Sequence, residues 1–218
     1  MNNALKIDFV SDVVCPWCAI GLAGLNIALE RLGPETRIDF AVHPFELNPG
    51  MPAAGQPQLE HITEKYGITA DQARINREQI RARAATVGFT MNRDDASLVY
   101  NTFDAHRLLA WAKEKNAQAA LKLVLLKAYF TDGKNIADRH VLAELATQAG
   151  LDGAEASEVL ASDRFAQEVR QEETLWTQRG IRSVPAVIVN DRYLISGGQP
   201  PEVFEEQLRA ILAGDNGE

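Results

Sequence analysis

The only two cysteines of this 218-residue chain, Cys15 and Cys18, stand three positions apart and enclose a proline and a tryptophan. A mostly apolar segment over 4–10 precedes them and predicts a buried strand. A helical pattern over 19–32 follows them. The two thiols therefore stand at a strand-to-helix junction, which restricts the fold to one that brings a strand and a helix together at this point.

The spacing of the two cysteines suits reversible disulfide chemistry. Residues at i and i+3 share one face of a helix, with α-carbons about 5–6 Å apart, inside the range that a disulfide requires. The start of a helix favours the thiolate form of Cys15, the nucleophile, while Cys18 lies a turn deeper and would resolve a mixed disulfide. Pro16 suits a first helical turn, and Trp17 is expected to point partly outward as an apolar shelf for a substrate chain.

Two other interpretations of the cysteine pair are weaker. A zinc site normally has four ligands, but the sequence has no second C-x-x-C and its four histidines show no ligand spacing, so no metal is expected. A purely structural disulfide would close almost no loop. Redox chemistry therefore remains the preferred interpretation.

Composition limits the partners and the compartment. The net charge of −8 makes nucleic acid an unfavourable partner. No apolar stretch is long enough to span a membrane, and the first residues resemble a strand rather than a signal peptide. We therefore expect a cytoplasmic protein, in a compartment where structural disulfides are rare.

The remaining pattern indicates an α/β unit interrupted by helices. Further strands are predicted over 36–42, 186–189 and 193–196, a closing helix over 200–212, and almost continuous helix from 58 to 179. The predicted domains are a discontinuous α/β domain, 1–50 with 180–218, and an all-helical insertion, 51–179. We expect the insertion to pack as one lid over the face that carries Cys15.

Several segments together resemble a known family. They are 11–18 (SDVVCPWC), 44–49 (PFELNP), 101–108 (NTFDAHRL), 128–134 (AYFTDGK), 184–185 (VP) and 196–199 (SGGQ). The set resembles the DsbA-like thioredoxin-fold oxidoreductases of the FrnE type. The resemblance implies an α/β thioredoxin fold interrupted by a large all-helical insertion, protein disulfide oxidoreductase or isomerase activity, and no bound cofactor.

The resemblance extends further, to the kappa-class glutathione transferases and the 2-hydroxychromene-2-carboxylate isomerases. These have serine in place of Cys15 and bind glutathione, so glutathione stays open here as a co-substrate. In thioredoxin-like folds the bond corresponding to Val184–Pro185 is cis and faces the cysteine pair, where the backbone before it can pair with an extended substrate. The alternative is a trans proline that starts an edge strand.

Three further residues are weaker candidates. Asp12 could cap the helix that carries the cysteines, or orient a water in proton transfer, or be an ordinary turn aspartate. Asn101 and His106 could line a cleft between the insertion and the thioredoxin unit, although a buried, hydrogen-bonded core histidine is the simpler interpretation of His106.

These observations favour a thiol–disulfide oxidoreductase that uses Cys15, Cys18 and Pro185 on disulfide-containing proteins or glutathione. The alternatives are a glutathione-dependent transferase or isomerase, and a chaperone-like or metal-binding redox protein. The cysteines distinguish these functions. Disulfide exchange requires both Cys15 and Cys18, a glutathione transferase does not require the pair, and a chaperone requires neither cysteine. The oligomeric state stays open, a homodimer included.

Overall fold

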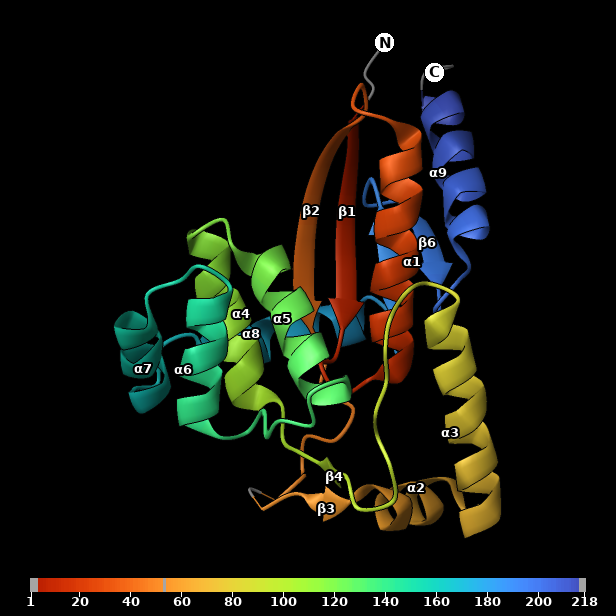
Figure 1. Ribbon diagram of the computed structural model, residues 1–218. Coiled ribbons are helices and arrows are strands. Elements are labelled where there is room, and N and C mark those ends of the chain that lie inside the picture. Colours follow the sequence, from red (N-terminus) through yellow and green to blue (C-terminus); the bar gives the residue numbers. More distant parts are fainter. Residues whose placement is uncertain (1–3, 53, 216–218) are drawn as a thin grey trace.

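The structure, a computed structural model, describes residues 4–52 and 54–215 (Figure 1). The predicted domain ends at 1–3 and 216–218 lie outside the described residues. The elements in chain order are β1 (Ala4–Ser11), α1 (Pro16–Leu32), β2 (Arg37–Pro44), β3 (Gln56–Pro57), α2 (Gln58–Tyr66), α3 (Ala70–Ala85), β4 (Leu98–Val99), α4 (Phe103–Glu114), α5 (Gln118–Phe130), α6 (Arg139–Gln148), α7 (Gly153–Ala161), α8 (Ala166–Gln178), β5 (Ala186–Val189), β6 (Tyr193–Ser196) and α9 (Pro201–Asp215).

The main sheet has the order β2-β1-β5-β6. Strands β1 and β2 are parallel and in register, so Ser11 pairs with Pro44 and both strands end at the same edge. Strand β5 runs antiparallel to β1, and β6 to β5. Asn190 and Asp191 both have positive φ in the turn between β5 and β6, which is the backbone that a tight hairpin requires. The loops after β1 and β2 therefore emerge side by side.

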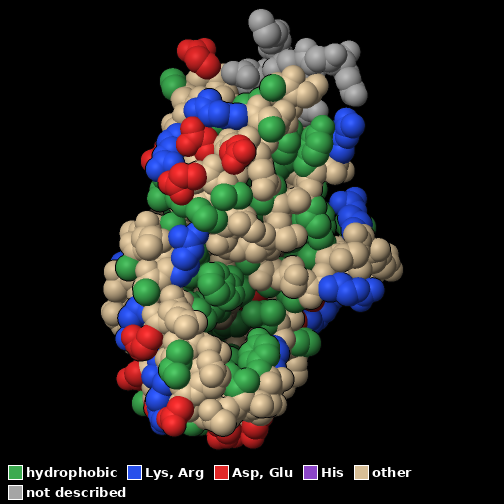
Figure 2. Space-filling model, turned by 90° about the vertical axis from the view of Figure 1, so that its right-hand side faces the viewer, with side chains coloured by type: hydrophobic (Ala, Val, Ile, Leu, Met, Phe, Trp, Pro, Cys, Tyr) green, Lys and Arg blue, Asp and Glu red, His purple; other side chains and the backbone are tan. Residues whose placement is uncertain are grey.

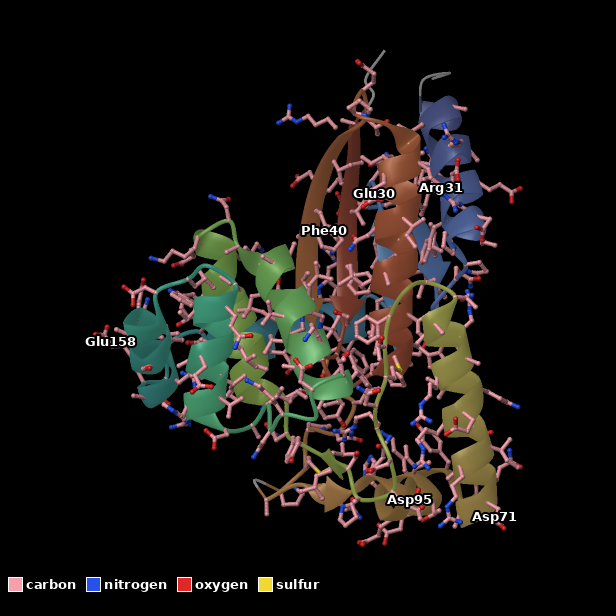
Figure 3. The ribbon with its side chains drawn as sticks, viewed as in Figure 1. Glu30, Arg31, Phe40, Asp71, Asp95 and Glu158 are labelled. Atoms are coloured by element: carbon pink, nitrogen blue, oxygen red, sulfur yellow. The ribbon has the colours of Figure 1, made fainter. Side chains whose placement is uncertain are left out.

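Alternate residues of β1 face two different layers. Phe9 belongs to the main hydrophobic core together with residues of α1 and α9, such as Leu25 and Phe204. Val10 packs on the other side with Trp176 of α8. Near the end of α1, Arg31 reaches α9, where its Nη1 lies 3.2 Å from Glu202 Oε1 (Figure 3).

The helical insertion does not form the single lid that the sequence predicted. Helix α3 packs against α2 and α1, whereas α4, α5 and α8 pack against β2, with α6 and α7 outside them (Figure 1). The prediction failed because two separate elements, the helix α1 and the edge strand β2, each offer an apolar surface to cover.

The segment between α3 and α4 also differs from the prediction of nearly continuous helix. It contains β4, which pairs with β3, but no helix over its described residues 86–102. Arg74 of α3 contacts this segment, because its Nε lies 2.8 Å from Asp95, while its Nη1 lies 2.9 Å from Asp71 of the same helix. Both aspartates lie at the lower end of the molecule in Figure 3.

A buried histidine joins the sheet to α8. His43 Nε2 lies 2.7 Å from Asp8 Oδ1, and its Nδ1 lies 2.9 Å from Glu172 Oε1. Its ring is 4.8 Å from that of Trp176, and Lys6 lies 3.3 Å from the same aspartate. Burial lowers the pKa of His43, but the two carboxylates raise it more, so the net pKa is above 6.5.

No helix among the described residues is long and apolar enough to cross a membrane.

Candidate active site

The helix α1 begins at Pro16, as expected for a proline in the first helical turn and three residues earlier than the apolar pattern over 19–32 indicated. Cys15 is its N-cap, and the carbonyl of Cys15 accepts hydrogen bonds from the N–H groups of Cys18 (3.1 Å) and Ala19 (3.2 Å). Proline is favourable here because the first helical position has no partner for an N–H. The two cysteines are free thiols and approach to 3.3 Å. Local sequence alone therefore brings them within reach of a disulfide.

The two cysteines differ less in exposure than the sequence suggested. Cys15 is 3% exposed and Cys18 is fully buried, while Trp17 between them is 41% exposed. Burial, followed by the hydrogen bond and charge of Cys15, raises the pKa of the Cys18 thiol well above its usual range. Cys18 is therefore held as a thiol, and deprotonating it requires help from its surroundings.

The segment before β5 lies against the first cysteine. Cys15 Sγ donates a hydrogen bond of 3.6 Å to the carbonyl of Val184, and the peptide bond between Val184 and Pro185 is cis. Two glycines permit this close approach. A β-carbon at Gly21 would lie 3.1 Å from Pro185 Cγ, and one at Gly198 would lie 2.9 Å from the carbonyl oxygen of Trp17. Nothing in the sequence around Gly21 indicated this role.

Asp12 is fully buried in the short loop between β1 and the cysteine pair. It does not cap α1, because no side chain caps that helix. Instead its Oδ2 accepts a hydrogen bond of 2.8 Å from the N–H of Leu47, and its Oδ1 lies 3.3 Å from His106 Nε2. Burial raises the pKa of Asp12, but the hydrogen bonds from His106 and Leu47 and the charge of Lys122 lower it to a net value below 3.8. The carboxylate is therefore held ionised inside the protein.

A buried lysine, Lys122 of α5, completes this group. Its side chain is fully buried, and its Nζ has no hydrogen-bond partner among the described residues. Its charge acts on Cys18, Asp12 and Cys15. We call Asp12, Cys18, His106 and Lys122 the buried polar cluster. The available signal for Lys122 was a lysine inside an otherwise apolar run, AALKLVLL.

A second lysine approaches the cysteines from the outside. Lys65 of α2 donates hydrogen bonds to the carbonyl of Leu47 (2.9 Å) and to Asn48 Oδ1 (2.6 Å). Burial lowers its pKa, while the charges of Asp12 and Cys15 act in the opposite direction. The insertion thus supplies two lysines whose charges interact with Cys15: Lys122, which is fully buried, and Lys65, which is exposed.

The other predicted site residues separate into two groups. His106 is buried, lies near Asp12, and lines a small pocket between β2 and the insertion helices α4 and α8, so its predicted place between the two parts is found. Asn101 accepts a hydrogen bond of 3.0 Å from the N–H of Phe103 at the start of α4, a local role. Pro16 and Val184 are half-buried beside Cys15.

Within residues 4–52 and 54–215, no group of three His, Cys, Asp or Glu side chains could hold a metal ion.

The surface near this site is hollowed. Figure 2 shows a depression lined mainly by hydrophobic side chains on the face that carries α3 and α9, at the height of the first turn of α1. An apolar hollow of this kind suits the burial of side chains from another molecule.

Comparison with known proteins finds a matching family and several similar proteins and structures. The model of the DSBA-like thioredoxin domain matches residues 6–209. The Bacillus subtilis protein YwbO is 28% identical over 205 residues, which cover 94% of this chain and 96% of that one. A Streptomyces coelicolor structure described as a probable DsbA oxidoreductase is 35% identical with a TM-score of 0.90, covering 96% of this chain and 90% of that one. The cytosolic disulfide reductase DsbM from Pseudomonas aeruginosa with GSH is 19% identical with a TM-score of 0.66, covering 95% and 99%.

Proposed function

Because this chain belongs to the DSBA-like thioredoxin domain family, a family of thiol oxidoreductases, we propose that it exchanges disulfides through Cys15 and Cys18. The observation that carries the proposal is the pair of free thiols, both buried and 3.3 Å apart at the start of α1. A pair so close can form a disulfide with little movement of the backbone.

The reaction follows from these positions. The thiolate of Cys15 attacks one sulfur of a substrate disulfide, forms a mixed disulfide and releases the other sulfur as a thiolate. Cys18 then loses its proton and attacks Cys15 Sγ, which forms the Cys15–Cys18 disulfide and releases the second substrate thiolate. Two electrons pass from the enzyme to the substrate, and the reverse sequence oxidises a dithiol.

The substrates are proposed to be disulfide-containing proteins and glutathione. The carbonyl of Val184 faces Cys15 and can accept a hydrogen bond from the backbone of an extended substrate, while the exposed ring of Trp17 offers apolar contact. Support for glutathione comes from DsbM, a disulfide reductase whose structure is described with GSH. Support for action in the cytoplasm comes from the same relative, described as cytosolic.

The test uses the two cysteines singly and together. Wild type is expected to reduce a disulfide-bonded test protein in the presence of a thiol reductant. Cys15→Ser should be inactive, and Cys18→Ser should accumulate a mixed disulfide with the substrate, detected by mass spectrometry. The thiol-free double variant is the control.

Two outcomes would overturn the proposal. Equal activity of wild type and the double variant would mean that the thiols are not used. Full turnover by Cys18→Ser with glutathione would instead mean that glutathione resolves the mixed disulfide at Cys15, so that Cys18 is not needed for exchange.

A further inference from the structure

We propose that Arg170 of α8 is a positioning residue for the cysteine pair, because it holds in place the two segments that in turn hold Asp12 beside Cys15. The inference rests on the proposed disulfide exchange and names a residue outside the cysteine motif on which that exchange depends. The observation behind it is that one guanidinium contacts both the loop after β2 and the start of α4. Both hydrogen-bond partners of the Asp12 side chain come from these two segments.

The first contact of Arg170 is with a carboxylate that is almost excluded from water. Arg170 Nη1 pairs with Glu46 Oε2, and the Glu46 side chain is only 2% exposed. The same Nη1 lies 2.9 Å from Glu173 Oε2, one turn later on α8. The other oxygen of Glu46, Oε1, has no hydrogen-bond partner within the described part of the chain. Arg170 therefore supplies the hydrogen bond that compensates the burial of Glu46.

Loss of the guanidinium would leave this carboxylate in an unfavourable place. Burial and the nearby Glu173 raise the pKa of Glu46, and the hydrogen bond and charge of Arg170 oppose them. A buried charge that loses its partner is strongly destabilising. Without Arg170, Glu46 has to take up a proton or turn outward to water, and turning outward moves the loop.

The loop that carries Glu46 is tied directly to Asp12. The next residue, Leu47, donates its N–H to Asp12 Oδ2 at 2.8 Å. The segment 45–48 lies between two prolines, which restrict its backbone. Lys65 of α2 holds the carbonyl of Leu47 at 2.9 Å from another side. A loop released at Glu46 would therefore turn about this second attachment and carry the N–H of Leu47 away from Asp12.

The second contact of Arg170 is with an aromatic ring at the start of α4. Its guanidinium carbon lies 3.9 Å from the centroid of the Phe103 ring, which is a close cation–π contact. His106 follows three residues later, and its Nε2 lies 3.3 Å from Asp12 Oδ1. Residues at i and i+3 lie on the same side of a helix. Arg170 therefore covers the side of α4 that presents His106 to Asp12.

The two routes meet at Asp12, next to the first cysteine. Burial raises the pKa of Asp12, which stays low because hydrogen bonds with His106 and Leu47 lower it more. The carbonyl of Asp12 also accepts a hydrogen bond of 3.4 Å from the N–H of Cys15. Displacement of either side-chain partner should therefore raise the pKa of Asp12 and disturb the backbone that positions Cys15.

The test follows the Asp12 carboxyl group and the exchange rate in matched arginine variants. In Arg170→Met, NMR titration should show the pKa of Asp12 raised by about one unit, the scale of one lost hydrogen bond to a charged group. The rate of exchange with a small aromatic disulfide should fall about tenfold, since a misplaced group slows a reaction without touching its atoms.

The matched control is Arg209→Met in α9. The Arg209 side chain is 52% exposed against 49% for Arg170, and each pairs with a glutamate of its own helix. Arg209→Met should match wild type in both the Asp12 titration and the exchange rate.

A second substitution separates positioning from general loss of stability. Glu46→Gln alone keeps the shape of the side chain and should shift Asp12 in the same direction, but less than Arg170→Met. In the Arg170→Met background, however, Glu46→Gln removes the unpaired buried charge. The double variant should therefore recover part of the Asp12 shift and of the exchange rate, a negative coupling that independent sites would not show.

The possible failures are distinct. An Asp12 titration in Arg170→Met equal to wild type, or a double variant further from wild type than Arg170→Met, would overturn the inference alone. If Arg170→Met does not fold, an unchanged Asp12 titration in Glu46→Gln would overturn it instead. Absence of disulfide exchange in wild type would overturn the proposed function, while the Asp12 titrations would still decide whether Arg170 positions this group.

Discussion

Replacing Gly21 by alanine tests how closely α1 must approach the segment before β5. Within a helix, alanine is more favourable than glycine by about 1 kcal/mol. At this position, however, the new β-carbon would lie 3.1 Å from Pro185 Cγ and 3.3 Å from Gly198 Cα. A proline ring and a backbone atom yield little, and overpacking of this kind costs about 1–3 kcal/mol. The net change in unfolding free energy should therefore lie between about zero and 2 kcal/mol of destabilisation.

A second glycine provides the matched control. Gly214 lies in α9, and no atom lies within 4 Å of a β-carbon built there. Gly214→Ala should therefore be neutral or stabilising by up to about 1 kcal/mol. Urea unfolding of the reduced proteins, with equal slopes, gives both values, and a lower stability of Gly21→Ala than of Gly214→Ala shows that the contact with Pro185 is unfavourable.

The same variant should affect exchange. Relief of the close contact moves Pro185 and the neighbouring Val184 carbonyl relative to Cys15, so Gly21→Ala should slow disulfide exchange several-fold while Gly214→Ala should not. Suppose that Gly21→Ala is at least as stable as Gly214→Ala and exchanges disulfides at the wild-type rate. The close packing of α1 against Pro185 then affects neither stability nor exchange, and the reasoning is refuted.

Three other predictions follow from burial and charge. In the reduced protein, an alkylating reagent followed by mass spectrometry should label Cys15 well before Cys18, which is fully buried with a raised pKa; faster labelling of Cys18 would reverse the proposed roles. Because the pKa of His43 is raised in the folded state, its stabilisation is complete below pH 6.5 and is lost as pH rises through the raised value. The unfolding free energy should fall by about 1.4 kcal/mol per unit of that shift. His43→Gln should show no such fall, and the same fall in the variant would assign it to other groups. Trp17→Ala should change stability by less than about 1 kcal/mol, since the ring is 41% exposed, yet raise KM for a protein disulfide about tenfold through lost apolar contact. An equal effect on exchange with glutathione would argue against its role as a shelf for a substrate chain.

The predicted fold class, an α/β thioredoxin fold with a helical insertion, is confirmed by the family match and by the similar structures. The packing of the insertion was predicted wrongly. Helical periodicity over 58–179 identified most of the helices, but periodicity only says that each helix has an apolar face. It does not say which surface that face meets. The sequence therefore did not show that some insertion helices pack on α1 and others on β2.

The cysteine pair shows what the sequence by itself determined. The i, i+3 spacing and the proline between the cysteines are local features, and they suffice to place two thiols at the start of a helix with the second thiol deeper. The β-α-β order around the pair is equally local, because the hydrophobic patterns of a strand and of a helix each depend only on neighbouring residues of the sequence.

Only the tertiary structure decided what surrounds the pair. Asp12 stands near the cysteines in the sequence, but the groups that hold it ionised come from the loop after β2, from α4 and from α5. The one sequence signal of Lys122 was its place inside an apolar run, and only the packing of α5 shows that its side chain is fully buried. The proton affinity of a buried group depends on desolvation and on charges a few ångströms away, and both are set by which distant segments fold together.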